Sequence, residues 1–369
     1  MIARAQAVAA LVEDEFDVVV VGGGITGAGV ALDAATRGYS VALIERADYA
    51  SGTSSRSSKL VHGGLRYLQN FDLGLVREAL LERQLMVALA PHLVHPLPLV
   101  VPAFDGVRPE RLMGMGLNLY DVMSVERDRR RRAEAWSPER HRMISGEEAM
   151  ELLPALRGRE PTGGYLFYDC QTDDVRLVLT VLGEAERFGA VCANRIEALG
   201  LLERDGRARG VRARDAETGA EFQIGAGHVV NATGVWADRL ADGPSAGAGT
   251  AGELAAGADP SMAERGGEPT SGPGDRVPVI KPSRGAHLIL RHEDLPLIGG
   301  AIVPAGEGRS IFALPWLGRT LIGTTDRDYE GELDHVSPSA DDVEYLLSAT
   351  NEFFGTGFGP GDLVGAYAG

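Results

Sequence analysis

Residues 51–68 hold the densest group of side chains that could bind an anionic ligand. Hydroxyls crowd around Arg56, and Lys59, His62 and Arg66 follow among glycines. Small hydroxylated residues and glycines let a loop lie close to a flat ring or a diphosphate while donating hydrogen bonds. A solvated serine-rich linker is the alternative, but it would not need the apolar residues interleaved here, which are Leu60, Val61, Leu65, Tyr67 and Leu68.

Arg66 and Tyr67 are the best-placed pair for a substrate with an anionic end. An arginine fork binds phosphate at two points, and a tyrosine hydroxyl can hydrogen-bond the substrate beside it. The alternative for these residues is structural, with Arg66 paired to a carboxylate of the protein. The pair is therefore a candidate for substrate binding.

His287 is the candidate proton acceptor, because imidazole is the side chain with an ordinary pKa near 6.5. It ends the segment Lys-Pro-Ser-Arg-Gly-Ala-His, in which Arg284 is a secondary candidate for anion binding. A lone histidine in a strand is often structural, and that alternative stays open. Residues 324–326 predict a turn that supports the site.

A glycine-rich loop near the amino terminus could position a nucleotide. Residues 16–21 form a β-branched run typical of a strand buried on both faces of a parallel sheet. Gly22, Gly24 and Gly27 follow at the spacing of the dinucleotide fingerprint and lead into a helical pattern. They allow a tight turn, a close approach to a pyrophosphate and the packing of helix on strand, respectively.

A second strand, residues 40–44, ends on Glu45. An acid at this position accepts hydrogen bonds from a ribose diol and disfavours a 2′-phosphate, so FAD or NAD is preferred over NADP. A structural glycine turn is the alternative, but strand, loop, helix, strand and acid occur here in the order that the motif demands. The sequence therefore predicts a nucleotide site with phosphates at the helix amino terminus.

The remaining chain predicts interleaved segments of two domains, as expected for 369 residues. A helical pattern over residues 73–87 ends before Pro91, and a second begins at Thr172. Turns at residues 204–206 and 217–219 separate strands that lead to Asn231. Alternating apolar residues between 277 and 326 predict antiparallel strands, whereas residues 241–276 have the composition of a disordered insertion.

Composition restricts the partners. The net charge of −16 argues against nucleic acid, and no apolar run reaches the length of a membrane span. The first fifteen residues lack the apolar core of a secretory signal, and Cys170 and Cys192 lack metal or redox spacing. We expect reduced structural thiols and a cytoplasmic protein. The basic cluster at residues 127–132 follows an apolar stretch and could dock on an anionic bilayer; a solvated charged face is the alternative.

At the level of motifs, the chain resembles the FAD-dependent glycerol-3-phosphate dehydrogenases, within the D-amino-acid-oxidase-like flavoproteins. The resemblance covers most of the chain from about residue 14. It rests on residues 53–68, on Tyr168-Asp169-Cys170 with Asp173-Asp174, on Asn231-Ala232-Thr233-Gly234 with Trp236, and on residues 322–326.

The resemblance implies an α/β fold, with a Rossmann-like FAD-binding domain interleaved with an α+β substrate domain built on an antiparallel sheet. The FAD-binding domain takes residues 14–91, 166–240 and 340–369, and the substrate domain takes residues 92–165 and 277–339. The implied catalytic residues are His287, Arg66 and Tyr67, and Arg284 joins them in substrate binding. The implied FAD contacts are Gly22, Gly24, Ile25, Thr26, Gly27, Glu45, Arg46, Thr53, Ser54, Ser57, Ser58, Lys59, Leu60, His62, Gly63, Gly64, Ala232, Thr233, Gly234 and Trp236; no metal is expected.

The implied reaction is hydride transfer from C2 of sn-glycerol 3-phosphate to FAD, giving dihydroxyacetone phosphate, with electrons passed to a quinone. Peripheral association with the inner face of the cell membrane follows from that acceptor, and a homodimer is left open. The alternatives are an FAD-dependent oxidase of an amino or hydroxy acid and an inactive fragment. The sequence ends before the family's later active-site arginine, its Gly-Gly-Lys flavin-contact segment and its C-terminal helical domain. We therefore expect a truncated member that binds FAD weakly and has little turnover.

Overall fold

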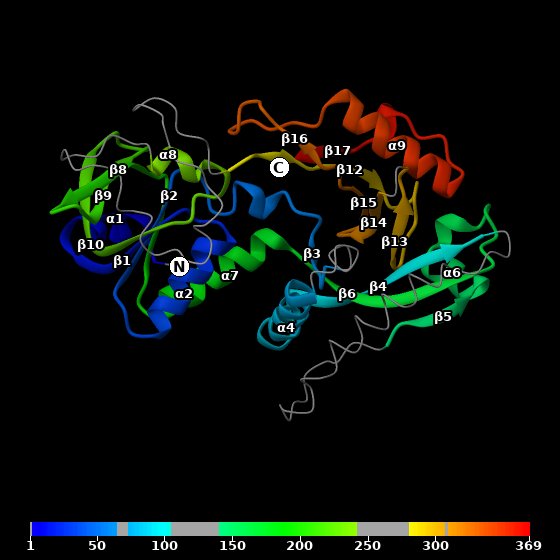
Figure 1. Cartoon of the computed structure of the whole chain (residues 1–369), viewed down its shortest axis with the longest axis horizontal. Coiled ribbons are helices and arrows are strands. Elements are labelled where there is room, and N and C mark those ends of the chain that lie inside the picture. The colour runs from blue at the N-terminus through cyan, green and yellow to red at the C-terminus, as the bar shows by residue number, and fades with distance from the viewer. Residues whose placement is uncertain (1, 65–72, 105–139, 242–279, 307–308) are drawn as a thin grey trace, which may run out of the picture. The chain divides into compact units, whose positions relative to one another are not determined.

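A computed structural model describes residues 2–64, 73–104, 140–241, 280–306 and 309–369. The chain divides into two compact units, each with its own sheet (Figure 1). Unit 1 comprises Met1–Ser55 and Val175–Pro282, and unit 2 comprises Arg56–Asp174 and Ser283–Gly369. The predicted insertion at residues 241–276 lies outside the described residues, apart from Ala241. The basic cluster at residues 127–132 also lies outside them.

Unit 1 is built on a sheet whose described strands run in the order β7-β2-β1-β10-β9-β8. The first four are parallel, and β9 and β8 continue the sheet antiparallel. The strands are β1 Glu15–Val21, β2 Val41–Glu45, β7 Val191–Asn194, β8 Ile196–Arg204, β9 Arg207–Asp215 and β10 Glu221–Asn231. The helices are α1 Arg4–Glu13, α2 Ile25–Thr36, α7 Asp174–Arg187 and α8 Ala237–Ala241.

Strand β1 has packed layers on both faces, as its β-branched run predicts. Val20 packs with Ala28 and Ala31 of α2 and with α7. The neighbouring residue Val19 points to the opposite face, where it packs with Leu11 of α1. Successive side chains of a strand point to opposite faces, so a strand covered on both sides carries no polar alternation.

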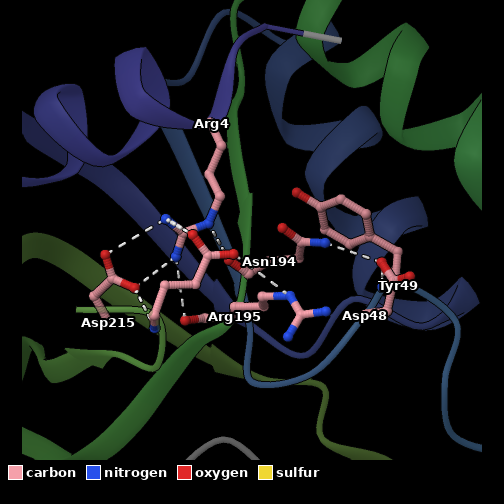
Figure 2. Close-up of polar contacts among 7 residues, drawn as sticks. Arg4, Asp48, Tyr49, Asn194, Arg195 and Asp215 are labelled. Atoms are coloured by element: carbon pink, nitrogen blue, oxygen red, sulfur yellow. Dashed lines mark hydrogen bonds and ion pairs between the residues drawn. The ribbon is translucent and has the colours of Figure 1, made fainter. Parts of the chain in front are cut away.

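Arg4 ties α1 to the end of the sheet (Figure 2). Its guanidinium donates to Asp215 Oδ1 at 2.6 Å and to the carbonyl of Asn194 at 3.3 Å. It also forms an ion pair with Glu217 at 3.0 Å. Ala7 and Leu11, on the apolar face of the same helix, are fully buried. Helix α1 is therefore held by both packing and charge.

Unit 2 is built on a mainly antiparallel sheet in the order β17-β12-β15-β14-β13-β4-β6-β3, with β5 also on β6. Strands β13 and β4 are its parallel neighbours. The strands are β3 Leu60–Val61, β4 Val94–Ala103, β5 Arg142–Ser145, β6 Gly163–Thr172, β12 Ala286–Arg291, β13 Gly300–Pro304, β14 Ser310–Trp316, β15 Arg319–Gly323 and β17 Gly365–Ala368, with β11 Ser283–Arg284 and β16 Arg327–Asp328 forming a separate pair. The helices are α4 Leu73–Leu89, α6 Gly146–Leu152 and α9 Ala340–Phe354.

Several expectations are confirmed. Helix α4 ends before Pro91, and β12, β14 and β15 are antiparallel neighbours. The turn between β8 and β9 contains Asp205 and Gly206 with φ of +54° and +70°, the left-handed pair of a tight hairpin. Cys170 and Cys192 are free and buried, and burial raises the pKa of each thiol to about 12. None of the described helices has the length and apolarity to cross a bilayer.

The two units differ from the predicted domain boundaries. The predicted nucleotide domain includes residues 56–91, 166–174 and 340–369, yet the described residues of these ranges pack in unit 2. The reason is strand pairing over long sequence separations: β3 pairs with β6, and β17 pairs with β12. Conversely, residues 280–282 pack in unit 1 rather than with the substrate segments.

Arg83 and Asp169 form a fully buried ion pair between α4 and β6. We expect Arg83→Met to lower the free energy of unfolding of unit 2 by about 3–5 kcal/mol, because Asp169 loses a buried counter-charge. Arg77→Met, on the exposed face of the same helix, is the control and should change it by less than about 0.5 kcal/mol. Urea unfolding followed by tryptophan fluorescence measures both, and equal losses would contradict a stabilising role for the pair.

Candidate functional site

Unit 1 contains a cavity of 580 Å³ at the carboxyl ends of β1 and β2. Twelve of the residues predicted to contact a cofactor line it, and they come from four separate stretches of the chain. These are Gly22, Gly24, Ile25, Thr26, Glu45, Arg46, Thr53, Ser54, Ala232, Thr233, Gly234 and Trp236. Ligands of open α/β sheets bind at this edge, outside the carboxyl ends of the strands.

The glycine loop is shaped by close approaches of the backbone. Gly22 has a φ of +116°, and a Cβ there would run into the carbonyl of Ala232. A Cβ on Gly27 would run into the carbonyl of Gly22, so α2 packs closely on the loop at this glycine, which does not itself line the cavity. Gly24 is the amino-terminal cap of α2, and it has no capping side chain of its own. The roles predicted for the first and third glycines are confirmed.

Glu45 ends β2 with both carboxylate oxygens hydrogen-bonded. Oε2 accepts from the amide of Gly23 at 2.8 Å, and Oε1 accepts from the amide of Ala47 at 2.8 Å. Each oxygen has a second lone pair, so the carboxylate can still accept from a ribose hydroxyl. The amides thus fix the acid beside the glycine loop.

Asn231 ends β10, and Trp236 lies in the stretch after it that lines the cavity. Asn231 Oδ1 accepts from Thr233 Oγ1 at 2.6 Å, and its Nδ2 donates to the carbonyl of Ala237 at 2.9 Å. The guanidinium of Arg46 lies 4.5 Å from the ring centre of Trp236. The indole Nε1–H of Trp236 is buried and finds no acceptor within the described part of the chain. A glycine-lined cavity with an unused buried donor fits a dinucleotide such as FAD.

The other seven predicted cofactor residues lie in unit 2, in or beside β3. They are Ser57, Ser58, Lys59, Leu60, His62, Gly63 and Gly64. The ammonium of Lys59 is buried and pairs with both oxygens of Asp174 at 2.9 Å. The amide of Gly63 donates to Asp169 at 3.1 Å, and that of Gly64 donates to His62 Nδ1 at 3.0 Å. Cofactor contact by this group stays a prediction.

His287 is buried within β12, with 3% of its surface exposed. Its Nε2 lies 2.8 Å from Ser58 Oγ, and its ring stacks on Tyr367 with centres 4.8 Å apart. Burial, and secondarily the charge of Lys59, lowers the pKa of His287 to about 3. The imidazole is therefore neutral at physiological pH and is a weak base in this environment.

Arg284 has a carboxylate partner already. Its Nη2 lies 2.7 Å from Asp342 Oδ2 and donates to Ser339 Oγ at 3.1 Å. Asp342 is fully buried and forms the capping box of α9 with Ser339. This geometry gives Arg284 a structural role at the start of α9. Its buried Nε has no hydrogen-bond partner among the described residues, and anion binding by Arg284 stays a prediction.

Arg66 and Tyr67, the predicted substrate pair, lie outside the described residues. Sequence reasoning also missed several residues that line the cavity. These are Val21, Ile44, Ser51, Gly52, Ile196, Glu197, Ala198, Leu199, Val235, Arg239, Leu240 and Ile280. Most are apolar or small, so their residue types carry no chemical signal, and only the arrangement of β8 in the sheet brings four of them to the cavity.

Comparisons with known proteins found similarities along almost the whole chain. The family model described as FAD dependent oxidoreductase matches residues 17–369. Glycerol-3-phosphate dehydrogenase 2 of Mycobacterium tuberculosis is 38% identical over 367 residues, which are 99% of this chain and 56% of that protein. The α-glycerophosphate oxidase of Streptococcus pyogenes is 35% identical over 350 residues, 93% of this chain and 51% of that protein.

Among solved structures, the glycerol-3-phosphate dehydrogenase of Bacillus halodurans complexed with FAD superposes with a TM-score of 0.71 at 29% identity. The match covers 99% of this chain and 58% of that one. The chain thus spans about half the length of the curated relatives that it matches.

The close approach at Gly27 can be tested with a matched pair of variants in α2. Gly27→Ala should destabilise unit 1 by about 1–3 kcal/mol, because its Cβ meets the rigid backbone of Gly22. Gly29→Ala should stabilise it by about 0.5–1 kcal/mol, since an added Cβ there meets nothing within 4 Å. Thermal and urea unfolding measure both, and a loss in Gly29→Ala as large as in Gly27→Ala would refute the steric account.

The low pKa of His287 predicts a pH-dependent stability. In the unfolded chain the imidazole has a pKa near 6.5, whereas in the fold the value is about 3. Below pH 6.5 the unfolded chain binds a proton that the fold excludes, so stability falls by up to about 1.4 kcal/mol per pH unit until pH 3.

The measurement compares the wild-type chain with His287→Gln by urea unfolding between pH 8 and pH 5. Between pH 7 and pH 5, the free energy of unfolding should fall by about 2 kcal/mol more in the wild-type chain than in the variant. Parallel curves for the two proteins would show that His287 titrates normally in the fold.

Proposed function

The chain belongs to the family of FAD dependent oxidoreductases, and from this premise we propose that it binds FAD and oxidises sn-glycerol 3-phosphate to dihydroxyacetone phosphate. The observation that carries the cofactor assignment is the unit 1 cavity, lined by the glycine loop and Glu45. The substrate assignment is supported by the names of the dehydrogenase and oxidase relatives, which share 35–38% identity with this chain.

When bound, FAD supplies a hydride acceptor for the alcohol carbon C2. The protein's task is to hold the phosphate and accept the hydroxyl proton. We assign the proton to His287, whose neutral imidazole has a lone pair available. A phosphate dianion beside it would raise its pKa, because an opposite charge favours the imidazolium form. Arg66 is the proposed phosphate ligand, and the hydroxyl of Tyr67 is proposed to hydrogen-bond the substrate beside it.

A quinone is the proposed electron acceptor, with contact to the inner face of the cell membrane through the basic cluster at residues 127–132. Oxygen is the competing acceptor, because both dehydrogenases and oxidases occur among the relatives. Anaerobic reduction followed by addition of a quinone and then of oxygen separates the two. A cytoplasmic, homodimeric enzyme remains our proposal for its state in the cell.

The decisive experiment titrates the chain with FAD up to millimolar concentration and then adds substrate without oxygen. FAD should quench the fluorescence of Trp236, and Glu45→Ala should weaken its affinity about tenfold, the cost of one charge-assisted hydrogen bond. Glu184→Ala, an exposed acid on α7, is the control. sn-Glycerol 3-phosphate should then bleach the flavin band.

Glycine, sarcosine and 2-hydroxy acids form the competing substrate panel. Bleaching by one of these and not by sn-glycerol 3-phosphate would overturn the substrate assignment while leaving the cofactor intact. Equal FAD affinity in wild type and Glu45→Ala would overturn the cofactor site itself.

A further inference from the structure

One carboxylate of unit 2 binds both neighbours of Ser58. Ser57 Oγ donates to Asp174 Oδ2 at 2.7 Å, and the ammonium of Lys59 donates to both carboxylate oxygens at 2.9 Å. The amide of Lys59 also donates to Ser57 Oγ at 3.1 Å. Ser58 therefore lies between two residues that both bind Asp174.

The Lys59–Asp174 ion pair is buried, and Lys59 has a backbone conformation that lysine rarely adopts. Lys59 is 4% exposed and Asp174 is 8% exposed, so water cannot readily solvate either charge in place of its partner. Lys59 has a φ of +58°, a left-handed conformation that costs about 1–3 kcal/mol and needs support from its surroundings. The rings of Trp316 and Tyr367 lie 5.4 and 5.2 Å from its ammonium.

Ser58 in turn contacts the candidate proton acceptor. Its hydroxyl lies 2.8 Å from His287 Nε2. The ring of His287 stacks on Tyr367 at 14° between the planes, and Gly323 on the other neighbouring strand leaves room for it, since a Cβ there would meet the ring. Tyr367 also donates its hydroxyl to the carbonyl of Ser57 at 2.7 Å. These contacts fix both the plane of the His287 ring and the hydrogen-bond partner of its Nε2.

The second ring nitrogen decides the tautomer. Nδ1 is buried and has no partner within the described residues. A buried N–H without an acceptor costs more than a bare nitrogen lone pair, so the proton belongs on Nε2, which donates to Ser58 Oγ. A single tautomer leaves a single lone pair on the ring for proton transfer.

We propose that Asp174 is a positioning residue for His287: through Ser57 and Lys59 it holds the Ser58 hydroxyl on Nε2 and keeps the imidazole in one tautomer. The functional meaning of this device rests on the proposed role of His287 as proton acceptor. The device itself involves only residues of unit 2 and operates with or without substrate.

The test is long-range nitrogen NMR of the histidine-labelled chain at pH 7, with His287→Gln used to assign the signals among eight histidines. The wild-type chain should show one neutral tautomer of His287, protonated on Nε2. Ser58→Ala, Asp174→Asn and Ser57→Ala should each lower the tautomer ratio about tenfold, as the loss of one buried hydrogen bond predicts. Glu148→Gln, in the exposed pair with Arg142, is the control and should leave the ratio unchanged.

Ser57→Ala keeps the Lys59–Asp174 pair, so it covers the case in which Asp174→Asn fails to fold. A mixed tautomer in the wild-type chain, or an unchanged ratio in both Ser57→Ala and Asp174→Asn, would overturn the proposal. The spectra need neither FAD nor substrate. Failure of the flavin to be bleached by sn-glycerol 3-phosphate would therefore count against the proposed reaction and not against the positioning of His287.

Discussion

The environment of His287 depends on the buried charges that anchor residues 56–64. Asp174 holds Ser57 and Lys59, and Asp169 holds the amide of Gly63 and pairs with a buried arginine. A buried carboxylate is costly unless it is paired, and breaking such a pair by removing one partner costs more than the pair contributes. The segment consequently has one low-energy position on β6. This rigidity matters for the proposed role of His287, because proton transfer requires donor and acceptor to be held at hydrogen-bond distance.

In unit 1 the cavity is shaped by close backbone contacts and not by buried charges. Gly22 and Gly27 allow carbonyl groups to approach where a Cβ would not fit, and the amide of Gly23 orients Glu45. The resulting wall of amides and one helix amino terminus suits a diphosphate, whose charge is spread over several oxygens. Such a site needs small residues at a few fixed spacings. That is why it can be recognised in a sequence.

The contrast between local backbone contacts in unit 1 and long-range buried pairs in unit 2 explains how much of the structure could be predicted from the sequence. The periodicity and glycine spacing of residues 16–45 correctly predicted β1, α2, β2 and the part of the cavity wall formed by the glycine loop and Glu45, because the interactions are local. Strand β4 could not be predicted, since Pro96, Pro98 and Pro102 are unusual in a sheet. The prolines lie opposite β6, whereas β13 pairs with β4 at Leu99 and Val100. The partners of Lys59 and His287 carry no local signal, because they are 115 and 229 residues away in sequence. For the same reason the pairing of Arg284 with Asp342 could not be read from the sequence.

If His287 accepts the hydroxyl proton as proposed, its low pKa also bears on substrate choice. An imidazole whose pKa is about 3 cannot retain a proton at neutral pH unless a negative charge arrives with the substrate. A neutral alcohol would leave that pKa low, whereas a phosphate ester would raise it and make proton uptake less unfavourable. Binding of the anionic end and acceptance of the hydroxyl proton would then be coupled through one electrostatic interaction. Under the proposed reaction this coupling would favour phosphorylated over unphosphorylated alcohols at the chemical step as well as in binding, because the stabilised imidazolium would form only as the proton is transferred.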